Sequence, residues 1–528
     1  MKNGGKLFAA IDVGSFNTEL VIYDISKKNG IREVDHLRVQ LPIGHDTYND
    51  GMVSNAMTEE ICGVLRRFSE VMKGYHVDDY AAYASSALRE ARNGLIVLDQ
   101  IRIRTGLRLI TASNSEYRYM SYKAVAGHKE DFNRALAQEM AILDVGFGSS
   151  QLSMFEKGNL TFTQNLSLGV LRISESAVKW DVDAKEVPEV IEELMNNELG
   201  SVADIYLRST RVKTLIITGE TINYLVLRGH SGFQNKQFSA DEFARMCRKV
   251  SKMSVTDLQD TYNVSRNAAR VMVPSAILFA RVVEMTGAAT VWTPGTVACD
   301  GFAADYAQEQ GLIKFDHDFE EDIISSARDL ADHYCCHREH VQAVEVFSGQ
   351  IFDATRKYHG LDPHCRLLLR IAAILHDCGK YVSITRGSMN AYEIIMSSEL
   401  IGLSHLDREI VANVVLYNIQ EFDYDDVSLG TDLSLYTEKN YTRRELKIVI
   451  AKLAAMLRLA NSIDRSHRQK LKGAKIDVRN DRLAITTGYD GNLTLEKYSV
   501  ERKADFFEEM IGIRPVIRRK RKWQAAKR

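Results

Sequence analysis

The sequence predicts an α/β protein built from two similar halves, followed by an all-helical domain and a small α+β domain. Three observations support this prediction. Strands and helices alternate from Leu7 to about Asp316, which is the α/β pattern. One acidic hairpin occurs twice, as "AAIDVGSFNTELVIYD" from Ala9 and "AILDVGFGSSQLSMFE" from Ala141. Beyond Asp316 the apolar residues take helical spacing.

The first half begins with two predicted strands, Leu7–Val13 and Leu20–Ile25, which "GSFNT" separates. A helix is expected around Thr58–Lys73. "LRLITASNSEYRYMSYKAVAG" then passes from strand to helix through Ser113 and Asn114, two residues that favour helix N-caps.

The second half restarts with the hairpin Ala141–Phe155, and "VKTLIITGETINYL" adds a strand, a glycine turn and a helix. Two similar halves imply a duplicated fold with an internal cleft. Glycine turns at strand ends that face this cleft would present backbone N–H groups to an anion.

Helical stretches such as "HCRLLLRIAAILHDCGK" and "RRELKIVIAKLAAMLRLANSID" define the third part. After Arg468, "AKIDVRNDRLAITTGYDGNLTLEKYS" alternates as strands do, and a helix, "ERKADFFEEMIG", follows. The predicted domains are 1–125 and 126–310 for the two halves, 311–470 for the helical domain, 471–513 for the α+β domain and 514–528 for a basic tail.

Composition sets limits on location and partners. A chain of 528 residues with 45% hydrophobic residues is long enough for several cores. The 68 basic and 70 acidic residues nearly cancel, so only the tail "RRKRKWQAAKR" favours nucleic acid, and no run is long enough to span a membrane. Seven cysteines without a CxxC pair favour reduced thiols, and we expect a cytoplasmic protein.

Asp12 and Asp144 each end an apolar run beside a turn of small residues. An aspartate in this position can hold a hydrated divalent cation while the turn holds phosphate oxygens. The two aspartates, one from each half, are suited to close on the same phosphate chain. Ordinary turn chemistry is the alternative for either copy taken alone.

Several segments then resemble one family, in the same order along the chain. "IDVGSFNTELVI", "ASSALREARNG", "ITASNSEYRYMSYKAV", "ILDVGFGSSQLSMFEKG", "SLGVLRISE" and "TGETINYL" resemble the Ppx/GppA family of exopolyphosphatases and guanosine pentaphosphate phosphatases. The resemblance implies two actin/Hsp70-like (ribonuclease H-like) subdomains, an HD-type helical domain and a small terminal domain. It also implies Mg²⁺ as cofactor, and homodimers are common among such relatives.

The resemblance assigns a role to each matching residue. Glu116 falls on the glutamate that positions the attacking water, Asp144 on the metal-associated aspartate and Arg89 on the arginine that grips phosphate. The implied phosphate-binding residues are Asp12, Gly14, Ser15, Gly146, Gly148, Ser149, Gln151, Gly219 and Thr221. Without the resemblance, Arg89 is equally a solvated helix residue, and Glu116 a group that caps its own helix.

Four positions depart from the family pattern. The second turn of the family reads Asp-Ile-Gly-Gly-Gly-Ser-Thr-Glu, whereas Phe147 stands here for a glycine and Gln151 for the glutamate. A bulky residue at 147 would cost about 1–3 kcal/mol if the turn required positive φ. Phe16 replaces a small polar residue in the first turn, and Glu220 replaces a glycine, which adds a carboxylate that would repel a polyanion.

The helical domain carries a second candidate site. His340, the pair His376-Asp377 and Asp464 suit one divalent metal such as Mn²⁺, Fe²⁺ or Zn²⁺, and "ILHDCGK" and "LANSIDRSH" resemble HD-domain phosphohydrolases. Lys380 would then meet a phosphate. In related chains we expect further histidines near positions 390 and 418. Here both positions are asparagines, Asn390 and Asn418, so we do not expect a second metal. Hydrogen bonds that tie helices together are the alternative for His376 and Asp377.

These observations predict a phosphatase that releases the terminal phosphate of inorganic polyphosphate or guanosine pentaphosphate with Mg²⁺. Two alternatives remain open: a regulatory protein that binds polyphosphate or an alarmone without turnover, and a metal-dependent nucleotide phosphohydrolase in the HD-type domain.

Overall fold

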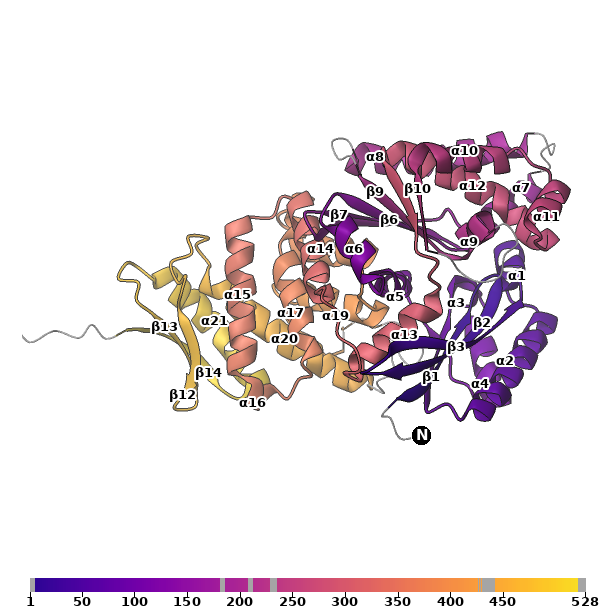
Figure 1. The fold of residues 1–528 in the computed structure, drawn as a ribbon. Coiled ribbons are helices and arrows are strands. Elements are labelled where there is room, and N and C mark those ends of the chain that lie inside the picture. Colours follow the sequence, from indigo (N-terminus) through magenta and orange to yellow (C-terminus); the bar gives the residue numbers. More distant parts are fainter. Residues whose placement is uncertain are drawn as a thin grey trace, which may run out of the picture. The chain divides into compact units, whose positions relative to one another are not determined.

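The computed structural model describes residues 5–180, 186–207, 212–227, 235–425, 427, 429 and 442–520 (Figure 1). The chain divides into two compact units, Met1–Phe319 and Glu320–Arg528. The first unit contains both copies of the acidic hairpin, and the second contains the helical region and a small sheet.

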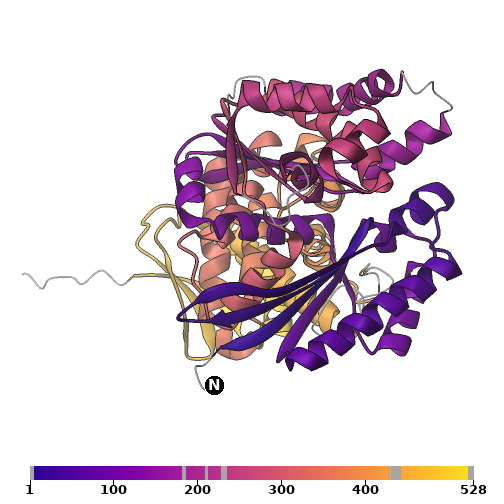
Figure 2. The same ribbon diagram turned by 45° about the vertical axis from the view of Figure 1, so that its right-hand side comes forward.

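The first half of unit 1 is built on a five-stranded sheet in the order β3-β2-β1-β4-β5. Figure 2 shows strands of this sheet in indigo. Its elements are β1 (Lys6–Val13), β2 (Asn17–Ser26), β3 (Gly30–Gln40), α1 (Ile43–Asp50), α2 (Asn55–Tyr75), β4 (Asp79–Ala84), α3 (Ser86–Glu90), α4 (Gly94–Thr105), β5 (Ile110–Thr111), α5 (Asn114–Ala126) and α6 (Lys129–Leu136). The predicted first two strands and first helix are confirmed as β1, β2 and α2.

The second half repeats this arrangement in a six-stranded sheet, β10-β11-β9-β6-β7-β8. Its elements are β6 (Met140–Val145), β7 (Ser150–Glu156), β8 (Asn159–Leu166), α7 (Val170–Lys179), α8 (Val187–Tyr206), β9 (Thr214–Thr218), α9 (Glu220–Leu227), β10 (Lys236–Ser239), α10 (Ala240–Val250), α11 (Val255–Tyr262), α12 (Arg266–Thr286), β11 (Thr290–Thr293) and α13 (Ala298–Glu309). In both halves an antiparallel three-stranded meander precedes a strand that lies parallel to its first strand.

The register of the two hairpins is equivalent. Asp12 pairs with Glu19 across β1 and β2, and Asp144 pairs with Gln151 across β6 and β7. The side chains of β1 from Phe8 to Val13 are buried, as expected of a strand that is covered on both faces. Both aspartates therefore end strands that are anchored in the core.

Helix α13 follows the second half in sequence but packs on the sheet of the first. Its Phe302, Ala303 and Ala307 share a hydrophobic cluster with Phe8 of β1 and Tyr23 of β2. The expected second half, 126–310, therefore ends with a helix that covers the other half.

Unit 2 consists of helices and a three-stranded sheet, β12-β13-β14. Its elements are α14 (Phe319–His333), α15 (Arg338–Ala354), α16 (Arg356–His359), α17 (His364–Leu375), the 3₁₀ helix η1 (Cys378–Tyr381), α18 (Gly387–Ser397), α19 (His405–Leu416), α20 (Arg443–Ile463), β12 (Lys475–Arg479), β13 (Arg482–Thr487), α21 (Thr494–Ile511) and β14 (Arg514–Arg519). Among the described residues of unit 2, strands begin only after α20, as the sequence predicted.

The predicted basic tail, 514–528, needs a correction. Arg514–Arg519 form β14, which pairs in parallel with β13. Arginines flank a single apolar pair in "RPVIRR", so the alternation that marks a strand is too short to recognise in the sequence. Residues 521–528 lie outside the described part of the chain.

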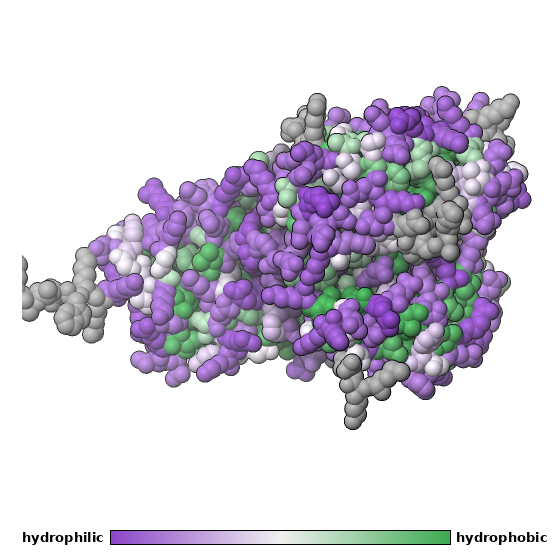
Figure 3. All heavy atoms as spheres, viewed as in Figure 1, coloured by the Kyte–Doolittle hydropathy of each residue, from purple (hydrophilic) through white to green (hydrophobic). Residues whose placement is uncertain are grey.

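Among the described residues, no helix has the length and apolar character needed to cross a bilayer. On the face drawn in Figure 3, hydrophilic side chains surround small separate groups of apolar ones.

Candidate functional site

A pocket in unit 1 brings the two acidic hairpins together. It is lined by Asp12, Gly14, Ser15, Glu19, Ser85, Ser86, Arg89, Asn114, Tyr117, Arg118 and Ser121 from the first half, and by Asp144, Val145, Gly146, Phe147, Gly148, Ser149, Thr218, Gly219, Glu220, Thr296, Val297 and Ala298 from the rest of the unit. Nine of the twelve residues predicted for the cleft are thus gathered here. The other three, Glu116, Gln151 and Thr221, are described by the structure but do not line the pocket.

Asp12 lines the pocket, and one of its two carboxylate oxygens has no hydrogen-bond partner among the described residues. Tyr117 donates a hydrogen bond of 2.7 Å to Oδ2, whereas the buried Oδ1 has no hydrogen-bond partner among the described residues. Burial raises the pKa of Asp12 to about 7, against the smaller opposing effect of the Tyr117 hydroxyl. The carboxyl group therefore lacks a partner that fixes its charge.

Asp144 has the same arrangement with a different partner. Arg118 on α5 forms an ion pair with Asp144 through Nη1 and Oδ1, and Oδ2 is buried without a hydrogen-bond partner in the described structure. One unpaired carboxylate oxygen from each half thus lies in the lining of the same pocket.

Glu116 caps its own helix, which is the alternative to a catalytic role that the sequence offered. Its Oε2 accepts a 2.8 Å hydrogen bond from the backbone N–H of Ser113, and Ser113 Oγ accepts one of 3.1 Å from Glu116 N. This reciprocal capping box fixes the start of α5. The structure therefore places Glu116 at a helix end, while the next two residues, Tyr117 and Arg118, enter the pocket.

Arg89 does line the pocket. Its Nη1 donates to Ala112 O and its Nη2 to Asn114 Oδ1, both at 2.6 Å. These bonds hold the guanidinium against the loop before α5, so the solvated-residue alternative does not describe it.

Among the other predicted residues, Ser15 and Gly219 lie in turns that line the pocket, whereas Gln151 lies in a strand. Ser15 Oγ lies 2.9 Å from Tyr48 Oη and 3.1 Å from Ser86 Oγ. Gln151 Nε2 donates to Thr163 Oγ1 at 2.5 Å, along the sheet and away from the pocket lining. Gly219 has a φ of 103°, and a Cβ there would meet Val145 O at 2.1 Å, so this turn requires glycine.

Phe16 and Phe147 form one contact between the two hairpin turns. Their rings stack with centroids 4.6 Å apart and an interplanar angle of 27°. Phe147 does not have positive φ, so the strain considered for this position is absent. The two aromatic departures from the family pattern therefore complement one another across the halves.

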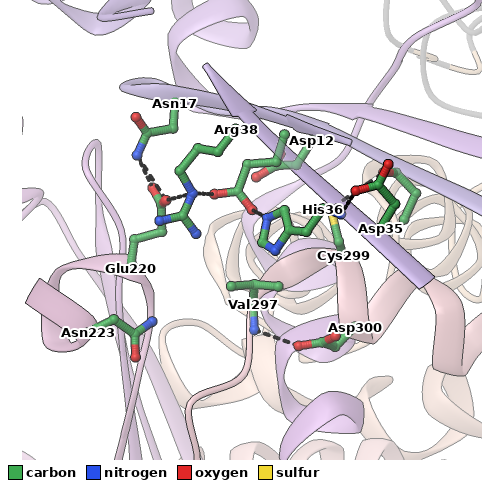
Figure 4. Close-up of polar contacts among 12 residues, drawn as sticks. Asp12, Asn17, Asp35, His36, Arg38, Glu220, Asn223, Val297, Cys299 and Asp300 are labelled. Atoms are coloured by element: carbon green, nitrogen blue, oxygen red, sulfur yellow. Dashed lines mark hydrogen bonds and ion pairs between the residues drawn. The ribbon is translucent and has the colours of Figure 1, made fainter. Parts of the chain in front are cut away.

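Glu220 also connects the halves, in an acidic cluster with Glu19. Figure 4 shows its contact with Asn17 of the first half. Asn17 Nδ2 donates to both oxygens of Glu220 at 2.8 Å, and Arg38 Nε lies 3.3 Å from Oε1. Arg38 also pairs with Glu19 at 2.6 Å. Burial, and then the charge of Glu19, raise the pKa of Glu220 well above its ordinary value, and burial also raises the pKa of Glu19.

Unit 2 contains a separate cluster of metal-binding groups. His340 on α15, and His376 and Asp377 between α17 and η1, offer one ligand atom each, all within 4.8 Å of one another. All three residues are buried. The sequence prediction for these three is consistent with this geometry.

His340 and His376 each form a hydrogen bond through Nδ1, so their Nε2 atoms face each other. His376 Nδ1 lies 2.7 Å from Ala373 O, an obligate acceptor, and His340 Nδ1 lies 2.9 Å from Asp464 Oδ2. The two Nε2 atoms are 3.3 Å apart. Burial lowers the pKa of His376, which favours a neutral ring whose Nε2 can accept a hydrogen bond or bind a cation.

Asp464 lies behind His340 and is not one of the converging ligand groups. Its Oδ1 accepts a 2.8 Å hydrogen bond from Gln469 N. A carboxylate that holds the outer nitrogen of a metal-binding histidine orients the ring. Lys380 donates a 2.7 Å hydrogen bond to Asp377 Oδ2 and leaves Oδ1 toward the histidines.

The comparisons with known proteins agree with this architecture. Two solved structures share the fold: an exopolyphosphatase-like protein, at 18% identity and a TM-score of 0.51 over 58% of this chain and 99% of that one, and an exopolyphosphatase from Cytophaga hutchinsonii, at 15% identity and a TM-score of 0.50 over the same shares. The first unit is thus a pair of actin-like subdomains, as predicted.

The chain belongs to the Ppx/GppA phosphatase family, whose model matches residues 21–301. Residues 324–503 match the model of Ppx/GppA phosphatase domain III. Among curated proteins, the chain is similar to Exopolyphosphatase 1 of Mycobacterium leprae, at 21% identity over 274 residues that cover 51% of this chain and 80% of that protein. The corresponding protein of Mycobacterium tuberculosis is 20% identical over the same length.

The residues missed from the sequence include Glu19, Tyr117 and Arg118, which line the pocket, and Arg38, which pairs with Glu19. Glu19 was accessible through the internal duplication, since it follows Asp12 by the same number of positions as Gln151 follows Asp144. Arg38 had no such signal, because only the pairing of β3 with β2 brings it opposite Glu19.

We expect Phe147→Ala to lower the free energy of unfolding of unit 1 by about 3–5 kcal/mol, because it removes a buried ring and leaves Phe16 without its partner. Phe147→Leu, which keeps most of the volume, should cost less than about 1.5 kcal/mol. Denaturant unfolding measures both. Equal small losses would show that the ring stack adds nothing.

We expect Glu220→Gln to stabilise the protein at pH 8 relative to the unchanged chain, with the difference disappearing near pH 5. Folded Glu220 keeps a proton that the unfolded chain releases above its ordinary pKa, so stability falls as pH rises toward the raised pKa. Glutamine has no such proton. Melting temperatures in chelator across this range measure the effect, and a uniform decrease at every pH would contradict it.

Proposed function

We propose that the cleft of unit 1 hydrolyses the terminal phosphoanhydride of inorganic polyphosphate or guanosine pentaphosphate. The single observation that carries the proposal is the pair of unpaired oxygens, Asp12 Oδ1 and Asp144 Oδ2, in one pocket lined by both glycine turns. Membership of a phosphatase family, and similarity to proteins named exopolyphosphatase, support it.

The residues present fit a divalent cation such as Mg²⁺. Asp12 and Asp144 would hold it through the two oxygens that lack hydrogen-bond partners. When bound, the ion would neutralise phosphate charge. The chain itself supplies Arg89 and the turns that follow Asp144 and Thr218 as candidates for contact with phosphate oxygens, although the N–H of Gly146 already donates to Ser149 O.

Glu116 remains a predicted water-positioning residue only. Its capping bond to Ser113 engages Oε2, whereas Asp12 lines the pocket and, like Asp144, has an oxygen without a hydrogen-bond partner among the described residues. A variant comparison separates the two, since Glu116→Gln retains a cap acceptor whereas Asp12→Asn removes the charge in the pocket.

The expected result is release of phosphate from polyphosphate by metal-free protein to which Mg²⁺ or Mn²⁺ is returned, and a loss of about 100-fold or more in Asp144→Asn. Asp99→Asn, an exposed change of the same type on α4, should leave the rate unchanged. Release measured with both substrates shows which one is preferred. Tight binding with no release by the folded protein would replace the hydrolase with a binding protein.

A second proposed activity belongs to unit 2, where His340, His376 and Asp377 converge. This arrangement supports a single metal ion such as Mn²⁺, Fe²⁺ or Zn²⁺ with open positions for water, as in a metal-dependent phosphohydrolase. Asp464 would orient His340 without binding the metal.

We expect Asp377→Ala and His376→Ala to abolish Mn²⁺ or Zn²⁺ binding at unit 2, and Asp464→Asn to weaken it by about 10- to 100-fold. His364→Ala, which removes a half-exposed histidine paired with Asp407, is the control. Metal content after dialysis and titration calorimetry measure binding. Equal retention in all variants would leave His376 and Asp377 as groups that tie helices together.

A further inference from the structure

Arg118 is a buried cation directed at the second acidic hairpin. It is 8% exposed, and Asp144 beside it is 5% exposed. Nη1 forms the ion pair with Asp144 Oδ1, and Nη2 donates to Ser149 O at 2.8 Å. One guanidinium therefore binds both the aspartate and the small-residue turn that follows it.

Gly146 makes room for this guanidinium. A Cβ on Gly146 would lie 2.7 Å from Arg118 Nη2 and 3.0 Å from Ser149 O. The glycine that the sequence assigned to phosphate binding thus also admits the arginine to the turn.

The position of Arg118 is fixed by its neighbours on α5. Glu116 closes the capping box with Ser113, and Tyr117 donates to Asp12. Three successive residues therefore hold a helix end, the first-half aspartate and the second-half aspartate. The guanidinium is preorganised in the pocket and needs no rearrangement to act there.

The guanidinium retains donors for a ligand. Arg118 uses three of its five N–H groups. One donates to Asp144 Oδ1, and two from Nη2 point to Ser149 O and, at 3.5 Å, to Ser149 Oγ. Its Nε–H and one Nη1–H have no acceptor among the described residues. Arginine in this situation is well suited to phosphate oxygens, which it binds with charge-assisted hydrogen bonds.

The same charge opposes a metal ion at Asp144. Two positive charges on one carboxylate repel each other, and the repulsion is weakly screened in a buried site. A divalent cation therefore gains less from Asp144 than from an unpaired aspartate. A phosphate chain that brings its own cation changes this balance, because it adds negative charge between the two.

We propose that Arg118 is a resident cation of the cleft, which binds a terminal phosphate group directly in the absence of metal and weakens the binding of free divalent metal. The inference rests on the proposed function, since it concerns the ligand of the same cleft. It gives Arg118 two opposite effects, favourable for phosphate and unfavourable for free metal.

Titration calorimetry of the full chain with tripolyphosphate in chelator tests the first effect, and titration with Mn²⁺ alone tests the second. All proteins carry Asp377→Ala, which silences the unit 2 cluster. We expect tripolyphosphate to bind in chelator, and Arg118→Met to weaken that binding by about 10- to 100-fold. The same variant should bind Mn²⁺ more tightly, whereas Arg118→Lys should retain most of the metal-free binding.

Asp144→Asn provides a second test that keeps the size of the side chain and leaves Arg118 in place. It removes the charge that Arg118 neutralises, so metal-free tripolyphosphate binding should be maintained or strengthened while Mn²⁺ binding in the cleft is lost. Weaker metal-free binding in this variant would overturn the proposal.

Two further outcomes separate this inference from the proposed function. If tripolyphosphate binds only when Mg²⁺ is added, and Arg118→Met changes neither titration, the role of Arg118 is wrong while the cleft remains a phosphate site. If the folded protein binds no tripolyphosphate under either condition, both the role of Arg118 and the proposed function fail.

Discussion

Asp144 ends a strand inside the protein, where a carboxylate is tolerated only with compensating charge or hydrogen bonds. The rest of the cleft follows from this constraint. Helix α5 must begin where Arg118 can reach Asp144, and the capping box at Ser113 fixes that start. The turn after Asp144 must be small enough to admit the guanidinium, which explains Gly146 in physical terms.

The two halves stabilise their buried aspartates with different partners. In the second half a guanidinium neutralises the aspartate, whereas in the first half Asp12 has a phenol beside it and a pKa near neutrality. The position equivalent to Gln151 is Glu19, which forms an ion pair with Arg38 and whose pKa burial raises. A duplicated hairpin has therefore acquired two unlike electrostatic environments, and the carboxylate at Glu220 is held by Asn17 and Arg38.

The sequence predicted the parts of this arrangement that depend on local pattern. Alternating polarity located β1, β2 and the paired acidic turns, and helical spacing located unit 2. It did not decide between the capping and the catalytic role of Glu116, because both roles are compatible with the same sequence pattern. Nor did it give the partner of Phe147, since the stack with Phe16 joins turns that are far apart in sequence and only the closed fold brings them together. The roles assigned to individual residues of the cleft and of the histidine cluster remain predictions.

The packing of α13 on the first sheet also affects the order in which the chain can fold. Phe8, Ala10 and Tyr23 leave the ribosome well before Phe302 and Ala303, which cover them and are made only after the entire second half. Domains generally fold as units while the chain emerges. Here the first sheet keeps one apolar face uncovered during synthesis, so its completion is coupled to the folding of its duplicate.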